Sequence, residues 1–509
     1  MKKNRLRSRL AGVLALALFA LAPAAQLAAQ TAAQQPGIPP RPEELKFRTR
    51  NFTPPRREQF RHVLSNGVVV YAVEDRDLPL INVSTLVRTG SYLDPAGKEG
   101  LASLVGSQMR AGGTASKTAE QFDEAADFLA ANISSVVAPL QGNAAVNVLA
   151  KDLDAGLALY FDMLRNPAFQ EDRLKLAKSQ LLQGMERRND RTDAIEDREW
   201  NRLLRGAEHF SAKLPTNSSV EAITREDLLA FHRKYYHPGN FVFAVSGDFD
   251  TKELIRKLEA AVKGWPASKE AAPEVPKPTH TPAAGVYAVH KPDVNQGRVV
   301  VGHLGAMRDN PDSYALTIMN DILGGGGFTS RITSRVRSDE GLAYSAGSGF
   351  GFGVYYPGVF RAGFQSKSAT TAQALDIVLE EISRMRTAKV SAEELETAKN
   401  YAVESFPSFF STAAQIAATF AQDEFTKRPA DYWDKYRDRI RAVTAEDVQR
   451  VAQKYLQPDQ LVVLVVGNLD DIARGNPDRP QHSLEKVGRG TIRRIPLPDP
   501  LTLVYPAAP

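Results

Sequence analysis

The sequence predicts an α+β protein made of two homologous domains. The main evidence is an internal repeat: the segment from Ile223 to Asp250 recurs, without gaps and at a spacing of 220 residues, from Val443 to Asp470. Each copy has a Thr that can cap a helix, an acidic first turn, a proline that ends the helix and a buried strand. A repeat of this length indicates two related domains and argues against a solenoid, whose units span roughly 20 to 50 residues.

A segment rich in proline, alanine and charged residues separates the two copies, and its composition favours an extended, semi-rigid linker. We therefore divide the chain into a signal peptide at 1–29, a Pro-rich arm at 30–59, domain one at 60–265, the linker at 266–283, domain two at 284–474 and a Pro-rich tail at 475–509. Alternating prolines after Ile495 forbid a helix and disfavour a central strand. We expect the tail to be extended and weakly packed.

The N-terminus has the pattern of a secretory signal. Five Lys and Arg residues within the first nine positions precede an apolar stretch at 10–21, and small residues suited to cleavage follow up to Ala29. The stretch is shorter than the roughly 18 apolar residues of a membrane span, so we prefer cleavage to the alternative of an uncleaved anchor. Cleavage removes five charges from a net charge of +5, which argues against a nucleic-acid partner. A periplasmic location is predicted.

Composition limits the chemistry further. The chain has 509 residues, of which 43% are hydrophobic, so it can bury sizeable cores and is not disordered as a whole. It has no cysteine, which excludes disulfides, thiolate zinc sites and a cysteine nucleophile. Any metal would have to be held by His and carboxylate side chains.

Local patterns place the elements in order. In domain one, two strand-like runs at 68–73 and 80–87 precede four helical patterns, which span 100–110, 119–130, 152–165 and 171–188. Thr118 and Gln121 form a potential capping box at the start of the second helix. In domain two, the segment 349–360 contains a Tyr-Pro-Gly turn and predicts a hairpin.

Several short segments resemble the pitrilysin/insulinase family of zinc peptidases and its relatives, the mitochondrial processing peptidases. In chain order they are Leu64–Gly67, Gly90–Pro95, Gly100–Ala102, Gly112–Thr114, Tyr235–Asn240, Gly324–Phe328 and Gly341–Ser345. The resemblance covers most of the mature chain. It implies that each domain is a mostly antiparallel sheet covered by helices, that the domains are arranged as a clamshell, and that the chamber can hold an unfolded peptide.

The metal motif of that family is degenerate in this chain. In active members His-x-x-Glu-His follows the Gly-Leu-Ala, so two imidazoles on one helix face bind zinc and the carboxylate polarises a water. Here Ser103, Gly106 and Ser107 stand at those positions, and the third family ligand, a Glu, falls near Gln183 and Gly184. A hydroxyl is a poor zinc ligand, and glycine is neither acid nor base. We therefore predict that this chain binds no metal or other cofactor.

The eight histidines offer no replacement site. No two of them are three or four residues apart, which is the spacing that would let a helix present both to one metal ion. His232 and His237 are five residues apart across a predicted helix end, where packing or capping is the simpler interpretation.

Domain two keeps a different family feature. Arg337 and Tyr344 match by spacing the Arg and Tyr that the family's second domain presents toward the zinc of the first. The resemblance implies a substrate-orienting role in trans, because an Arg can donate to a peptide carbonyl and a phenol to an oxyanion. Without the resemblance, an Arg that ends a helix and a Tyr that begins a strand are the simpler interpretations. The glycine run at 324–327 lacks a following Gly-Lys-Ser/Thr, which favours a flexible loop over nucleotide binding.

Together these features predict the non-catalytic subunit of an exported heterodimeric zinc metallopeptidase. It would be inactive alone and would orient peptide substrate for a homologous, zinc-bearing partner subunit through Arg337 and Tyr344. The alternative is a peptide-binding or scaffold clamshell of the cell envelope without hydrolytic activity. An active standalone peptidase is disfavoured, because unrelated residues would have to replace three motif positions.

Overall fold

The computed structural model describes residue 41 and residues 52–266, 272–488 and 490–506. The predicted signal peptide and most of the predicted Pro-rich arm lie outside the described residues. Pro54–Pro509 form one compact unit, and the elements described below belong to it. Among the described residues, no helix combines the length and the apolar character that crossing a membrane requires.

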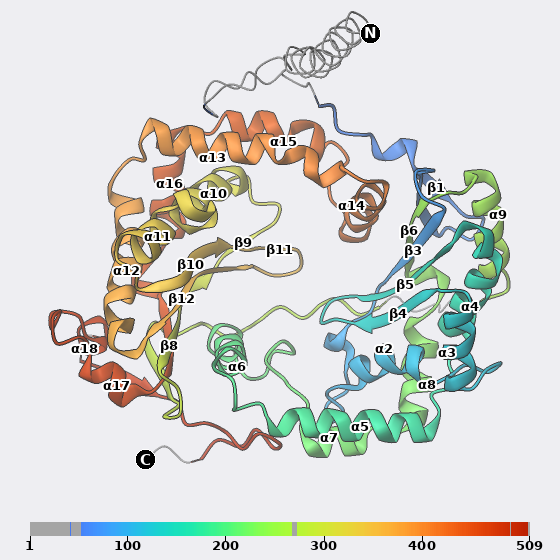
Figure 1. Cartoon of the computed structure of the whole chain (residues 1–509), viewed down its shortest axis with the longest axis horizontal. Coiled ribbons are helices and arrows are strands. Elements are labelled where there is room, and N and C mark those ends of the chain that lie inside the picture. The colour runs from blue at the N-terminus through green and yellow to red at the C-terminus, as the bar shows by residue number, and fades with distance from the viewer. Residues whose placement is uncertain (1–40, 42–51, 267–271, 489, 507–509) are drawn as a thin grey trace, which may run out of the picture. The chain divides into compact units, whose positions relative to one another are not determined.

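The first half of this unit is built on a six-stranded sheet, drawn from blue to green in Figure 1. The strand order is β1-β2-β6-β3-β5-β4, with β2 and β6 parallel and the other neighbours antiparallel. The strands are β1 (Arg61–Val63), β2 (Val69–Glu74), β3 (Leu80–Val87), β4 (Asn132–Val137), β5 (Gly142–Leu149) and β6 (Phe241–Gly247). The helices are α2 (Leu101–Ala111), α3 (Ala119–Phe128), α4 (Leu153–Arg165), α5 (Glu171–Glu186), α6 (Thr192–Arg205), α7 (Asn217–Ala222), α8 (Arg225–Tyr235) and α9 (Thr251–Val262).

The second half repeats this plan, drawn from yellow to red in Figure 1. Its sheet has the order β10-β12-β8-β13-β7-β14, and β7 is parallel to both of its neighbours. The strands are β7 (Gly285–His290), β8 (Gln296–Leu304), β10 (Ala343–Phe350), β12 (Val359–Lys367), β13 (Val462–Gly467) and β14 (Ile492–Arg494), with a separate small pair of β9 (Ala306–Met307) and β11 (Phe352–Gly353). The helices are α10 (Ser313–Asn320), α11 (Arg331–Thr333), α12 (Thr371–Thr387), α13 (Ala392–Glu404), α14 (Ala413–Thr426), α15 (Tyr432–Arg441), α16 (Ala445–Tyr455), α17 (Leu469–Arg474) and α18 (Leu484–Val487).

The predicted fold class of two α+β domains with mostly antiparallel sheets is confirmed. The repeat is visible in the equivalent pairs α8/β6 and α16/β13: both helices begin with a Thr and Asp capping box, at Thr224 and Asp227 and at Thr444 and Asp447. Strands β6 and β13 lie inside their sheets, and every residue of both is buried. Such continuous apolar runs are expected where both faces of a strand are covered.

The two halves exchange one helix each, a feature that the sequence analysis did not predict. Ile195, Trp200 and Leu204 of α6 pack into a core with β7, β8 and β13 of the second sheet. In return α14 packs on the first sheet, where the Phe420 ring lies 6.0 Å from the ring of Tyr71 in β2. Each sheet is therefore covered on one face by a helix of the other half. The exchange is reciprocal, because α6 and α14 occupy equivalent places in the repeat.

The C-terminal tail is more tightly packed than its prolines suggest. Strand β14 adds to the edge of the second sheet beside β7, and Leu484 of α18 is buried in the core of that half. The hydroxyl of Tyr505 donates to the buried carboxylate of Glu199 on α6. Pro477 and Pro480 lie before β14 and the alternating prolines begin just after Ile495, beyond its end, so an edge strand forms without losing ladder hydrogen bonds.

Candidate functional site

Helix α2 carries the degenerate zinc-motif positions. Ser103 and Ser107 are exposed, one turn apart on the helix, and the Ser107 hydroxyl donates to the carbonyl of Leu104 at 3.2 Å. Gly106 is buried, and an added Cβ at this position would lie 2.4 Å from the backbone nitrogen of Val137 in β4. The helix backbone therefore approaches β4 too closely for any side chain at the position where the family has its Glu.

The third-ligand positions lie on α5. Gln183 and Gly184 are both exposed, and an added Cβ at Gly184 would meet no atom within 4 Å. In the described part of the chain, no group of three or more His, Asp or Glu side chains could hold a metal ion. The hydroxyls, the two glycines and the amide at the motif positions therefore do not fit zinc.

The N-terminus of α2 is held by a carboxylate. Asp94 accepts hydrogen bonds from the backbone N–H groups of Gly100 at 2.9 Å and Ala102 at 2.7 Å. Burial outweighs these hydrogen bonds and raises the pKa of Asp94 to about 6. The N–H groups at the start of the helix are thereby satisfied by a group outside it.

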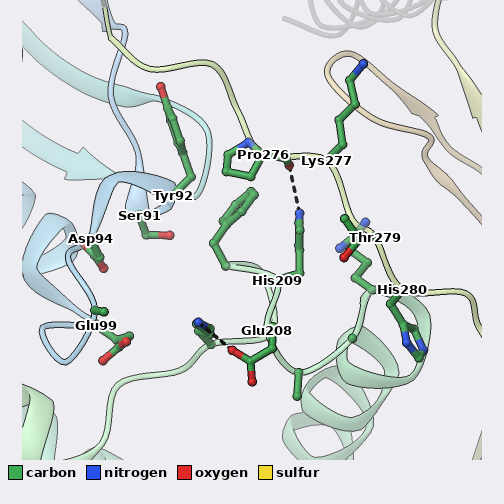
Figure 2. A pocket seen from close by; sticks show the side chains of 16 residues that line it. Ser91, Tyr92, Asp94, Glu99, Glu208, His209, Pro276, Lys277, Thr279 and His280 are labelled. Carbon is green, nitrogen blue, oxygen red and sulfur yellow. Dashed lines mark hydrogen bonds and ion pairs between the residues drawn. The ribbon is translucent and has the colours of Figure 1, made fainter.

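Asp94 also lines a cavity of about 530 Å³, shown in Figure 2. Its walls come from the loop before α2, the loop after α6 and the linker between the two halves. On the linker side, the Nε2 atom of His209 lies 3.2 Å from the carbonyl oxygen of Pro276, and the hydroxyl of Tyr92 donates to the carbonyl of Pro273. These contacts fasten the linker beside the start of α2.

The structure brings the predicted pair Arg337 and Tyr344 together. Arg337 lies in a π-helical segment (Ser334–Asp339) and Tyr344 near the start of β10. The guanidinium carbon of Arg337 is 4.7 Å from the centre of the Tyr344 ring, and Tyr344 is 84% exposed. The contact is a cation–π interaction, which leaves the N–H groups of Arg337 and the Tyr344 hydroxyl free to donate elsewhere.

Arg337 differs from the two neighbouring arginines on the same helical stretch. Arg331 is paired with Glu394 at 2.6 Å, and Arg335 with the buried Glu381 at 2.6 Å. Among the described residues, Arg337 has no carboxylate partner. The two paired arginines thus fasten α11 and its extension to the helices behind them, whereas the third is available at the surface.

A third member of this group, Phe328, was not predicted from the sequence. The glycine run that we expected to be a flexible loop instead forms a π-helical turn (Asp321–Gly325) and a 3₁₀ turn (Gly327–Thr329). The latter places the ring of Phe328 at 4.4 Å from the guanidinium carbon of Arg337. An aromatic residue directly after four glycines was the available sequence signal.

The similarity to known proteins shows the family to which the chain belongs. Residues 69–208 match the family model described as Insulinase (Peptidase family M16), and residues 222–401 match the one described as Peptidase M16 inactive domain. A relative from Rickettsia bellii, named an uncharacterized zinc protease, is 24% identical over 368 residues, which cover 67% of this chain and 86% of the relative. A probable mitochondrial-processing peptidase subunit beta from Arabidopsis thaliana is 22% identical over 82% of this chain and 80% of its own length.

Among solved structures, the peptidase M16 inactive domain from Pseudomonas fluorescens has a TM-score of 0.72 and 25% sequence identity, and the match covers 80% of this chain and 97% of that one. The two family models together span more than half of the chain. This chain belongs to peptidase family M16, the insulinase family, and is a member without the family's metal-binding motif.

Proposed function

We propose that the protein is the non-catalytic subunit of an exported heterodimeric zinc metallopeptidase. In this proposal it orients peptide substrate for a zinc-bearing partner subunit, and Arg337 and Tyr344 are the residues that face the substrate. The observation that carries the proposal is the contrast among the three arginines: Arg337 alone lacks a carboxylate among the described residues and lies over the ring of an exposed tyrosine.

The roles follow from the chemistry of the two side chains. The guanidinium of Arg337 presents N–H donors in a plane, which suits a main-chain carbonyl of an extended peptide. The phenol of Tyr344 can donate a hydrogen bond to the oxygen that becomes negative when that carbonyl is attacked. Zinc and the general base would both come from the partner, because Ser103, Gly106 and Ser107 supply neither.

Relatives support an assembly of this kind. The Arabidopsis relative is named as a subunit, and a chain that keeps the substrate-facing pair while lacking the metal motif needs a second chain for hydrolysis. The basic and apolar N-terminal pattern supports export to the periplasm.

The test is peptide hydrolysis by the mature chain, alone and mixed with a His-x-x-Glu-His homologue from the same cell, in the presence of zinc. The probe is an internally quenched fluorogenic peptide of the insulin B chain. We expect activity to require the mixture, and Arg337→Ala and Tyr344→Phe to lower it by roughly tenfold or more. The matched control is Arg233→Ala, which changes an exposed arginine on α8.

The outcomes separate the alternatives. Failure of the chain to stimulate any active homologue would favour the peptide-binding or scaffold protein. Hydrolysis by this chain alone would show that the motif positions were misinterpreted. Stimulation that survives both substitutions would remove Arg337 and Tyr344 from the proposal.

A further inference from the structure

Phe328 is an exposed aromatic residue in direct contact with Arg337. We infer that it is a positioning residue: its ring holds the guanidinium of Arg337 in place, so that the N–H groups stay directed to a main-chain carbonyl of a bound peptide. This inference rests on the proposed function of Arg337 and extends it by one residue.

The contacts define a three-residue group, Phe328, Arg337 and Tyr344. The guanidinium carbon lies 4.4 Å from the Phe328 ring centre and 4.7 Å from the Tyr344 ring centre. No ring contact among the described residues joins Phe328 to Tyr344, so the two rings are linked through the cation. A long arginine side chain with no ion pair would otherwise sample many rotamers, which lowers its efficiency as a donor.

Phe328 is held by an ordered turn. Gly327 has a φ of 66°, a left-handed conformation that side chains disfavour, and its carbonyl accepts a hydrogen bond from the Ser330 hydroxyl at 2.7 Å. Before it, the N–H of Gly326 donates to the carbonyl of Asp321. The glycines therefore fix the direction of the Phe328 ring without burying it, and it remains 65% exposed.

The arrangement suits a neutral or anionic acceptor in the plane of the guanidinium. Contact with an aromatic ring uses the face of the cation, while its hydrogen-bond donors point outward along the edges. A carbonyl can therefore bind without displacing either ring. A carboxylate neighbour, of the kind that Arg331 and Arg335 have, would compete for the same donors.

The test uses the mixed assay with the same quenched peptide and compares Phe328→Leu, Phe328→Tyr and the control Phe128→Leu, which changes an exposed aromatic residue of α3. We expect Phe328→Leu to reduce kcat/KM about two- to fivefold, the usual range for an exposed cation–π contact. Phe328→Tyr should restore the wild-type value, since the ring is kept. The double variant Phe328→Leu with Arg337→Ala should be no slower than Arg337→Ala alone, because Phe328 acts through Arg337.

A second readout does not depend on the partner. In the chain alone, labelled with ¹³C and ¹⁵N in arginine, the rings should shift the side-chain proton signals of Arg337 upfield, and Phe328→Leu should relieve part of that shift. Phe128→Leu should leave it unchanged. An unchanged Arg337 signal in Phe328→Leu, or additive losses in the double variant, would overturn the inference. If Arg337→Ala has no effect on hydrolysis while the signal does move, the proposed function fails but the positioning contact stands.

Discussion

The Cβ position of Gly106 on α2 would lie 2.4 Å from the backbone nitrogen of Val137 on β4. Carbon atoms of real side chains do not approach a backbone atom so closely, so the helix and the strand are in direct main-chain contact here. Active relatives have their general base at this position. In this chain the close packing of α2 on β4 leaves no room for that side chain.

This contact predicts opposite effects for two glycine-to-alanine substitutions. Gly106→Ala should destabilise the protein by about 1–3 kcal/mol, because the methyl group forces α2 and β4 apart. Gly184→Ala, on the exposed face of α5 where nothing lies within 4 Å, should stabilise it by about 0.5–1 kcal/mol through helix propensity. Urea unfolding of both variants beside the wild type measures the difference. Equal effects in the two would contradict the proposed close packing.

Restoring the metal motif should fail for the same reason. A variant with Ser103→His, Gly106→Glu and Ser107→His places a long side chain where a methyl group does not fit. We expect a destabilised chain, as measured by thermal unfolding. The peptide assay should show no zinc-dependent hydrolysis, to which the missing third ligand at Gln183 and Gly184 also contributes. Ser103→His with Ser107→His, which leaves Gly106 in place, is the control and should keep wild-type stability within about 0.5 kcal/mol. Zinc-dependent activity in the triple variant would show that α2 can move away from β4.

Alanine substitutions at Arg335 and Arg337 should distinguish a residue with a structural role from one with a functional role. Arg335→Ala removes a partner of Glu381, which is 0% exposed, and should destabilise the chain by about 1–3 kcal/mol, with Arg384 still nearby. Arg337→Ala breaks no ion pair but removes its two cation–π contacts at the surface, so it should cost less than Arg335→Ala, about 0.5–1 kcal/mol. Denaturant unfolding of the isolated chain gives both values. A large loss of stability in Arg337→Ala would mean that its position reflects packing and not substrate binding.

Local sequence patterns were sufficient for the repeated elements and for the first helices of domain one, and insufficient for the long-range partners of these elements. The capping boxes at Thr224 and Thr444 and the apolar runs of β6 and β13 are short-range signals, so the repeat and its helices could be predicted. The exchange of α6 and α14 could not, because an amphipathic helix shows which face is buried and not which sheet buries it.

Local sequence patterns were also insufficient for part of the candidate site. Arg337 and Tyr344 were identified by spacing and resemblance, whereas Phe328 reaches Arg337 only because irregular helical turns at 321–325 and 334–339 replace the ordinary helical register. A nine-residue separation places side chains on different faces of a regular helix, so no periodic pattern predicts this contact. The pairing of β14 with β7 was likewise hidden by the prolines that follow it.

Because each sheet is covered by a helix of the other half, a substitution in one half should destabilise the other half. Phe420→Ala on α14 removes a buried ring from the first sheet and should cost about 3–5 kcal/mol. Hydrogen exchange measured by mass spectrometry should then show faster exchange in β2 and β6, more than 170 residues away in sequence. Phe128→Ala, which changes a ring that is 91% exposed, should leave both strands protected. Faster exchange confined to α13 and α14 would show that the first sheet does not depend on the crossing helix.

The stability of the loop before α2 should depend on pH through Asp94. Its folded-state pKa of about 6 lies above the usual value of an unfolded Asp, about 3.9, so the folded state binds more protons between these pH values. The free energy of unfolding contributed by this group is therefore largest below about pH 4 and falls as the pH rises toward 6, by roughly 2–3 kcal/mol in total. Asp94→Asn cannot ionise, so its unfolding free energy lacks this dependence on pH. In urea unfolding from pH 4 to 7, the wild type should therefore lose stability relative to the variant as the pH rises. Asp75→Asn, which changes a carboxylate in the loop between β2 and β3, is the control. A difference that is constant with pH would mean that the two N–H groups at the start of α2 hold Asp94 ionised in the folded protein throughout the window.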